Sequence, residues 1–247
     1  MAGHSKFKNI QYRKGAQDKK RAKQFAKIGR EIQIAVKIGG TDPESNPRLR
    51  LAMTNARSVN MPKENVDRAI NKNNTDTADY SEVRYEGYGP FGTAFIVEAL
   101  TDNKNRTASE VRTVFNKFNG NLGENGCVSY LFDKIGSIVY PSSSGEIDNF
   151  IEFSIENDTK DIIENNEFYE IITKLENFNE ITENFTEKFG HPESANIIWK
   201  AKDLVKVSEN SILTTYKLIA GLDDCEDVQN VFYNFEFDEK DLALIEQ

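Results

Sequence analysis

The chain has 247 residues and a formal net charge of −9, a length that allows one large domain or two to three small ones. Its best apolar run, residues 94–100, contains Glu98 and is far shorter than the ~20 apolar residues that span a membrane. Two cysteines and two histidines exclude a disulfide framework and a four-cysteine zinc site. The basic N-terminus has no apolar segment behind it, so we expect a cytoplasmic protein that uses no membrane, metal or cofactor.

The charge is unevenly distributed along the chain. Residues 1–74 carry 17 Lys and Arg against 6 Asp and Glu, whereas residues 75–247 carry 14 against 34. Such asymmetry indicates a partner for the basic end, and dense cations suit a phosphate backbone because binding releases condensed counterions. The acidic remainder would repel nucleic acid and so orient the basic end toward it, or would meet a basic protein.

The basic end is predicted to form a three-helix bundle. Apolar residues recur at spacings of three and four over residues 18–39, which predicts a first helix with Asp18 as its N-cap. A second helix should begin at Asn46 and a third at Pro62. The polar residues 71–79 are typical of a linker.

The second and third helices also permit a helix-turn-helix interpretation, with residues 62–72 as the recognition helix. The turn between them has no glycine, and Glu64 and Asp67 dilute the positive charge that this helix would bring to DNA. We therefore favour a packed helical hairpin.

After residue 80 the pattern predicts alternating strands and helices. Strands are expected at residues 83–86, 93–100 and 127–132, with a helix at 107–118. The next segments follow the β-α-β-β-α-β order of a ferredoxin-like domain, with strands near 137–140, 161–163, 167–172 and 196–207 and helices near 146–156 and 175–189. A helix at 211–221 and a strand at 231–237 should return to the sheet that begins at residue 83.

The expected fold class is α+β and multidomain, a three-helix bundle followed by two α/β domains. Residues 1–79 would form the basic, nucleic-acid-binding domain. Residues 80–133 and 206–247 would form a discontinuous α/β domain, and residues 134–205 an acidic, ferredoxin-like domain.

The candidate nucleic-acid contacts are the cations of the basic end. At about 100° per residue, several of them share one arc of the first helix, opposite its apolar stripe. The predicted contacts are Lys6, Lys8, Arg13, Lys14, Lys19, Lys20, Lys23, Lys27, Arg30, Arg48, Arg50 and Lys63. A solvated charged face would give the same pattern. Phe7 and Tyr12, interleaved with these cations, would stack on bases or attach the N-terminal arm to the bundle.

Two loops have the residue types of ligand-binding motifs. Residues 87–92 satisfy G-x-G-x-x-G, but Pro90 interrupts the loop and a strand follows, so a strand-to-strand turn is favoured over a dinucleotide site. In the polar loop 101–107, Asn105, Arg106 and Thr107 are candidates for holding an anion such as a phosphate at a helix N-terminus. The alternative is that Asn105 or Thr107 only caps the helix.

Catalytic groups are sparse. His4 and His191 have no nucleophile beside them in the sequence. Residues 146–193 hold 14 carboxylates against 3 lysines, without the spacing of a metal-binding loop. We expect no catalytic residue and no enzymatic activity; a nuclease, the enzyme class weighed here, would need a metal site.

The chain resembles the YebC/PmpR family, which also includes the mitochondrial translational activator of cytochrome c oxidase. The resemblance runs over the full length and rests on several motifs in order. They are Met-Ala-Gly-His-Ser-Lys at 1–6, Gly-Gly at 39–40, Asn-Pro-Arg-Leu-Arg at 46–50, Asn-Met-Pro-Lys-Glu-Asn at 60–65, Tyr-Glu-Gly-Tyr-Gly-Pro at 85–90, Leu-Thr-Asp-Asn-Lys-Asn-Arg-Thr at 100–107, Gly-Asn-Leu-Gly at 120–123 and Asp-Val-Gln-Asn-Val at 227–231. The sequence departs from the family pattern at Phe7, Tyr12, Phe91 and Phe232-Tyr233, where Trp, His, Gly and Tyr-His are usual.

The resemblance implies three domains with a discontinuous middle one, and a role in gene regulation. Family members are described as DNA-binding transcriptional regulators or as ribosome-associated translation factors, some of which relieve stalling. We expect a translation factor whose basic end docks on ribosomal RNA, tRNA or mRNA, on or near the ribosome. The alternative is a regulator that binds promoter DNA. A monomer is compatible with the sequence, which leaves the oligomeric state open.

Overall fold

The structure, a computed structural model, describes residues 17–72, 80–207 and 209–237. The chain divides into two compact units. Of the described residues, one unit comprises Gln17 and residues 80–133, 199–207 and 209–237, and the other comprises residues 18–72 and 134–198. The predicted domain boundaries remain predictions.

Three helices form the first part of the second unit: α2 (Gln17–Gly39), α3 (Pro47–Ser58) and α4 (Lys63–Asn71). Their shared core contains Ile32 and Val36 of α2, Leu49 and Ala52 of α3, and Ala69 of α4. The three-helix bundle and the packed α3–α4 hairpin are therefore confirmed. Asp18 was expected to cap the first helix, but α2 already begins at Gln17.

Asn46 joins α2 to α3. Its side-chain oxygen accepts the Leu49 N–H at 3.1 Å and so caps α3, while its amide nitrogen donates to the carbonyls of Ala35 and Gly40 at 2.7 and 2.8 Å. A Cβ atom on Gly39 would lie 2.7 Å from the Asn46 side chain, so glycine is required for this close approach. The Asn46 side chain is 3% exposed, and both its amide nitrogen and its amide oxygen form hydrogen bonds.

The rest of the second unit has ferredoxin-like topology. Its strands are β4 (Phe132–Pro141), β5 (Asp161–Glu164), β6 (Phe168–Thr173) and β7 (Ser194–Ala201), and its helices are α6 (Ile147–Glu156) and α7 (Phe178–Phe189). The sheet order β5-β6-β4-β7 is the one that the predicted β-α-β-β-α-β pattern requires. An aromatic core fills the space under the helices, where the rings of Phe150 and Phe189 stack with centroids 3.9 Å apart.

The first unit contains the discontinuous sheet. Its strand order is β3-β1-β2-β8, with β1 at Ser81–Tyr88, β2 at Ala94–Thr101, β3 at Asn121–Leu122 and β8 at Val228–Tyr233. The expected return of the C-terminal segment to this sheet is confirmed by the antiparallel pairing of β8 with β2. Helices α5 (Lys104–Lys117) and α8 (Glu209–Asp224) cover one face, where Phe95, Phe115 and Leu222 are fully buried.

The strand predicted at residues 127–132 is wrong. Residues Ser129–Leu131 form a short 3-10 helix, and β4 begins only at Phe132 and absorbs the strand expected at 137–140. The cause is Glu86, whose carboxylate accepts the N–H groups of Val128 and Ser129 at 3.0 and 2.9 Å. These donors are therefore unavailable to a strand ladder.

The β1–β2 connection is the strand-to-strand turn that was expected, with a 3-10 turn at Pro90–Gly92. Gly92 has a φ of 77°, but Phe91 also lies in the left-handed region, with a φ of 61°. Only one glycine of the predicted set therefore supplies a positive φ here. The segment 119–123 is the predicted helix C-terminus and turn, since Phe118 ends α5 and Asn119 has a φ of 60°.

Asp227 fixes the start of β8 against the end of β2 and the first turn of α5. Its carboxylate accepts hydrogen bonds from Thr101 at 3.0 Å, Thr107 at 2.7 Å and Arg106 at 2.8 Å. Burial by itself raises the pKa of Asp227, but the donors from Arg106, Thr107 and Thr101 outweigh it and bring the pKa below its ordinary value. The buried charge is therefore compensated by segments about 120 residues away in the chain.

We expect Asp227→Asn to lower the free energy of unfolding by about 2 kcal/mol at pH 7, because hydrogen bonds to a buried charged group are lost. The depressed pKa contributes stability above the ordinary aspartate value of 3.8, and this contribution is lost as the pH falls below it. The difference in free energy of unfolding between the wild type and Asp227→Asn should thus become smaller below pH 3.8, as measured by urea titration. Asp102→Asn, which removes the exposed partner of Arg106, is the control and should change stability little. A difference in free energy of unfolding that stays constant with pH would contradict the role given to the ionised Asp227 carboxylate.

We expect Asn46→Ala to destabilise the three-helix part by about 2 kcal/mol, because a cap and two carbonyl partners are lost together. Amide hydrogen exchange should show faster exchange in α2 and α3. Ser45→Ala, at an exposed neighbouring position, should leave exchange unchanged. Equal exchange in the two variants would show that Asn46 does not join the helices.

Candidate nucleic-acid interface

The basic face of α2 is the main feature of this interface. Lys23, Lys27, Arg30 and Lys37 follow one another at helical spacing, about half a turn from the buried Ile32 and Val36. Lys23 and Lys37 are exposed, and Lys27 and Arg30 are half-buried. The cations lie on the side of α2 away from Ile32 and Val36, as the sequence predicts, but Ile34, which falls within the same arc, is also buried.

The remaining candidates of the basic end are only partly described. Lys19 and Lys20 lie in the first turn of α2, but their side chains are outside the described residues. Lys6, Lys8, Arg13 and Lys14, together with Phe7 and Tyr12, also lie outside them. The contacts expected of these residues stay predictions.

Two predicted contacts on α3 are occupied by partners within the same unit. Arg48 donates from Nε to a carboxylate oxygen of Glu31 at 2.7 Å. Arg50 donates to the carbonyls of Pro43 and Glu44 at 2.7 Å each and forms an ion pair with Glu183. Each side chain is 32% exposed. Arg50 therefore orders the loop before α3, Arg48 ties α3 to α2, and both offer less charge to a phosphate than the sequence suggests.

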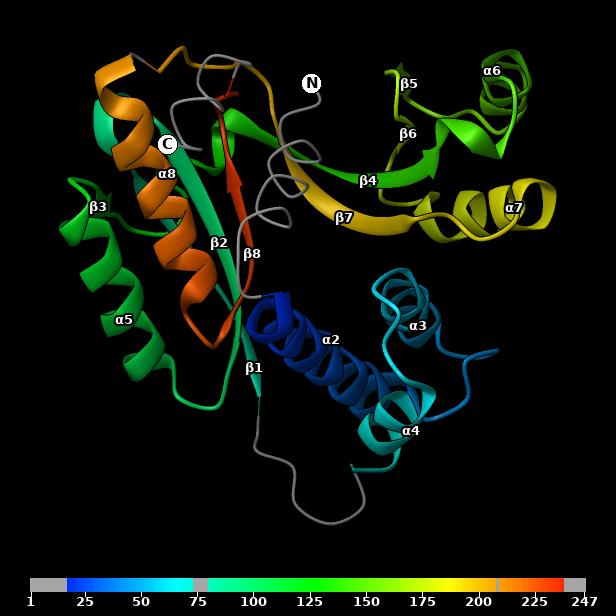
Figure 1. Cartoon of the computed structure of the whole chain (residues 1–247), viewed down its shortest axis with the longest axis horizontal. Coiled ribbons are helices and arrows are strands. Elements are labelled where there is room, and N and C mark those ends of the chain that lie inside the picture. Colours follow the sequence, from blue (N-terminus) through cyan, green and yellow to red (C-terminus); the bar gives the residue numbers. More distant parts are fainter. Residues whose placement is uncertain (1–16, 73–79, 208, 238–247) are drawn as a thin grey trace. The chain divides into compact units, whose positions relative to one another are not determined.

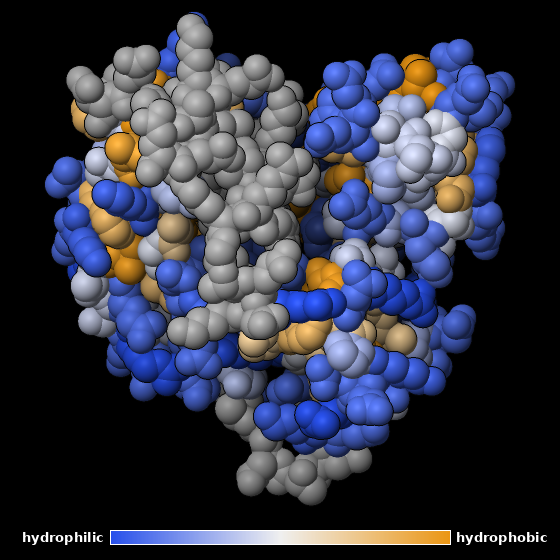
Figure 2. Space-filling view, viewed as in Figure 1, coloured by the Kyte–Doolittle hydropathy of each residue, from blue (hydrophilic) through white to orange (hydrophobic). Residues whose placement is uncertain are grey.

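Three further arginines are exposed on the helices of the basic end and are not among the predicted contacts. Arg21 lies over the ring of Phe25 at 5.7 Å, Arg57 lies 3.0 Å from Nε2 of His191, and Arg68 is exposed in the last turn of α4. Lys63, which was predicted, is exposed at the start of α4 next to Glu64. The signal for the missed residues was their position on exposed helix faces. Hydrophilic side chains predominate over the visible surface of α3 and α4 (Figure 2).

The polar loop before α5 holds an anion that belongs to the chain itself. Arg106 and Thr107 donate to Asp227, and Arg106 also pairs with Asp102 at 2.7 Å. These contacts raise the pKa of Arg106, first through the hydrogen bond to Asp227. Asn105 is exposed. Neither Asn105 nor Thr107 caps the helix, because α5 begins at Lys104 and Asn103 accepts the Arg106 N–H at 3.1 Å.

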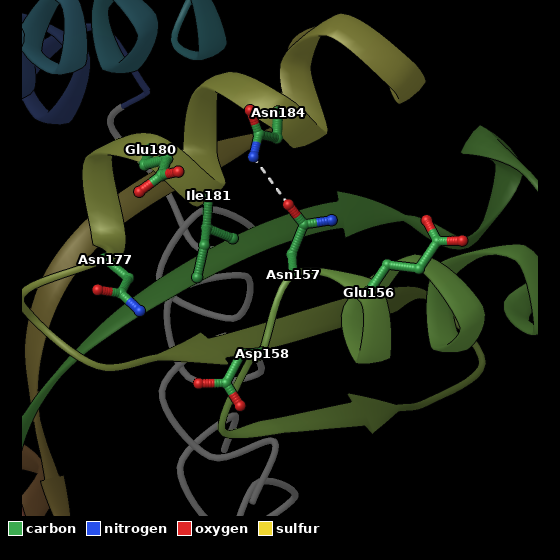
Figure 3. Close-up of a pocket in the computed structure, with 7 residues that line it drawn as sticks. All are labelled: Glu156, Asn157, Asp158, Asn177, Glu180, Ile181 and Asn184. Carbon is green, nitrogen blue, oxygen red and sulfur yellow. Dashed lines mark hydrogen bonds between the residues drawn. The ribbon is translucent and has the colours of Figure 1, made fainter.

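A polar pocket of about 230 Å³ lies between α6, α7 and the loop before β5 (Figure 3). Carboxylates of Glu156, Asp158 and Glu180 line it, and Asn184 donates to the side chain of Asn157 at 2.8 Å. Negative charge of this density opposes phosphate binding, so the pocket does not extend the nucleic-acid interface. Lys174 neutralises part of it by pairing with Asp158 at 3.3 Å.

Within residues 17–72, 80–207 and 209–237, no helix is long and apolar enough to cross a membrane. Over the same residues, no group of three or more His, Cys, Asp and Glu side chains is arranged to hold a metal ion. The two cysteines, Cys127 and Cys225, are not joined in a disulfide.

Comparison with known proteins assigns the family. Residues 5–76 match the family model described as the TACO1/YebC protein N-terminal domain, and residues 80–235 match the TACO1/YebC second and third domain. A probable transcriptional regulatory protein of Rickettsia bellii is 49% identical over all of this chain and 98% of its own length. One from Rickettsia canadensis is 50% identical over all of this chain and 99% of its own.

A solved structure has the same fold. A conserved hypothetical protein from Aquifex aeolicus matches with a TM-score of 0.82 and 43% identity, over 90% of this chain and 93% of its own. The motif resemblance is therefore confirmed along the whole chain, and the curated relatives carry the name of regulators. The chain belongs to the TACO1/YebC family, the YebC/PmpR family of its sequence motifs.

Proposed function

We propose that this regulator is a non-enzymatic translation factor that docks its basic helical end on RNA of the ribosome, on tRNA or on mRNA. The observation that carries the proposal is the row Lys23, Lys27, Arg30 and Lys37 on the side of α2 opposite Ile32 and Val36. Residues 21–72 hold 11 Lys and Arg against 5 Asp and Glu. Cations gathered along one helix face suit a phosphate backbone, because such contacts position the protein and release condensed counterions.

The proposal favours RNA over duplex DNA because no helix of the bundle has the character of a base reader. Direct readout needs a helix whose side chains enter the major groove and reach base edges. On α3, Arg48 and Arg50 are held by carboxylates, and α4 carries Glu64 and Asp67 among its cations. What remains is a phosphate-binding surface, which suits a folded RNA recognised by shape and backbone.

The alternative function is a DNA-binding transcriptional regulator, which the names of the curated relatives favour. In this case the same cations would position the bundle on the duplex, and α4 would supply base contacts from Lys63 and Arg68. The two functions differ in how strongly the protein discriminates between sequences.

We expect the double variant Lys23→Glu and Lys27→Glu to lose at least about tenfold of its affinity for ribosomes at 0.15 M salt. The dependence of log affinity on log salt should become shallower by about 2, because two phosphate contacts are removed. Co-sedimentation over a salt series measures both quantities. The circular dichroism of the variant should match the wild type, since neither lysine is in the core.

The matched control is Arg112→Glu with Lys117→Glu, which changes the net charge equally on exposed positions of α5. The affinity of this control for ribosomes should stay within about twofold of the wild-type affinity, because α5 is not part of the basic face of α2. If both double variants weaken binding equally, the effect is one of net charge, and the proposed interface is wrong.

A second measurement separates translation from transcription. The protein should bind promoter and random DNA duplexes with affinities within about tenfold of each other, since phosphate contacts carry no sequence information. A preference of about 10³ or more for one duplex, with no ribosome association, would establish the transcriptional regulator instead.

A further inference from the structure

Three aromatic side chains are exposed where β1 ends in the first unit. Tyr88 is the last residue of β1, Phe91 lies in the turn to β2, and Tyr130 lies in the 3-10 helix before β4. Their side chains are 37%, 66% and 63% exposed. We call Tyr88, Phe91 and Tyr130 the aromatic end of this sheet.

Tyr88 and Tyr130 adjoin each other. The Tyr88 hydroxyl donates to the carbonyl of Cys127 at 2.9 Å, which ties the end of β1 to the turn that carries Tyr130. The neighbouring Tyr130 phenol, with burial as a smaller cause, raises the pKa of Tyr88 to about 12. The Tyr88 ring therefore remains neutral at physiological pH.

A buried carboxylate holds this turn in place. Glu86 is fully buried and accepts the N–H groups of Val128 and Ser129, while Arg84 lies 3.0 Å from its other oxygen. Burial by itself raises the pKa of Glu86, but the backbone donors and Arg84 outweigh it and lower the pKa. Because a buried charge is costly without such partners, the turn has one favoured arrangement, and Tyr130 is presented by a rigid base.

Gly123 packs closely against the turn that carries Tyr130. A Cβ atom on Gly123 would lie 2.6 Å from the sulfur of Cys127, so only glycine allows the chain to approach there. Lys202 also contacts this turn. Its ammonium group donates to the Tyr130 carbonyl at 3.0 Å and lies 3.6 Å from the carboxylate of Asp133.

Phe91 has a conformation that stability does not explain. Its φ of 61° and ψ of 29° lie in the left-handed region, which strains every residue with a side chain. A phenyl ring that is 66% exposed recovers little of this strain through burial. Strain kept at an exposed aromatic residue points to a role in binding.

We infer that the aromatic end binds the unpaired bases of single-stranded RNA by stacking. Aromatic faces accept any base, whereas paired bases in a duplex offer no free face, so this site would distinguish single strands from duplexes. Because Lys202 beside Tyr130 is already paired with Asp133, base stacking rather than charge carries this site. The aromatic composition, two phenols and a phenyl without an aliphatic side chain among them, suits flat bases better than an apolar helix. This inference rests on the proposed function and adds to it the class of nucleic acid that is bound.

The test compares a 12-nucleotide RNA carrying 2-aminopurine with the same strand annealed to its complement. The double variant Phe91→Gly with Tyr130→Ala should bind the single strand about tenfold more weakly and lose the fluorescence quenching that stacking causes. Its affinity for the duplex should stay within twofold of the wild type, because the basic helices are unchanged. Thermal unfolding should be preserved, since Phe91→Gly relieves strain and Tyr130 is exposed.

Two controls accompany the test. Tyr130→Phe keeps the ring and should bind the single strand like the wild type. Ile151→Ala with Ile155→Ala removes exposed apolar side chains from α6 and should have no effect on either RNA.

The outcomes separate the two proposals. Unchanged single-strand binding by the aromatic variant, while Lys23→Glu with Lys27→Glu weakens both RNAs, overturns the stacking site and leaves the proposed function standing. An equal loss on single strand and duplex also overturns it, because the rings then act through the fold. If the wild type binds neither RNA nor ribosomes, the proposed function fails and the stacking site fails with it.

Discussion

The carboxylate of Asp227 is the contact on which the first unit depends. The C-terminal strand β8 pairs with β2, which ends at Thr101, 126 residues before Asp227. The entropy of closing this long loop is therefore lost before the strand pairing stabilises the unit. Strand hydrogen bonds alone leave the register of such a pairing open to slippage. A single buried charge that collects donors from Thr101, Arg106 and Thr107 fixes it, because no shifted register satisfies all three donors.

Most elements of the fold could be predicted because their residues follow a local period. Helical spacing in α2 and α5 is a property of neighbouring residues, so it is visible in the sequence. The alternation predicted over residues 231–237 is wrong, since β8 ends at Tyr233 and residues 231–235 are all buried. The turn at residues 127–131 could not be predicted. Glu86 occupies a position in β1 that alternates with buried residues and should face solvent, and its burial depends on donors 42 residues further along the chain. Asn103 caps α5 through a local hydrogen bond from the Arg106 N–H, whereas the Thr107 hydroxyl donates to Asp227, 120 residues further along the chain.

The candidate interface shows a similar division. The sequence is sufficient to place the cations of α2 on one face, since a helix fixes their spacing. It does not show which cations are already paired, and Arg48 and Arg50 lose part of their value to Glu31 and Glu183. Counting charges therefore overestimates the contribution of α3. The net charge of a segment predicts its attraction to phosphate. The ion pairs within the fold determine which of its cations contribute to that attraction.

The two proposed contact types depend differently on salt and on base pairing, and together they would distinguish one class of nucleic acid from another. Cations on α2 attract any phosphate backbone, and their contribution falls steeply with salt. Stacking on Tyr88, Phe91 and Tyr130 depends on free base faces and changes little with salt. Phosphate contacts alone would leave the protein bound to every nucleic acid, and aromatic contacts alone would bind slowly and weakly. A chain that combines both, without a base-reading helix, is suited to folded RNA that exposes single strands.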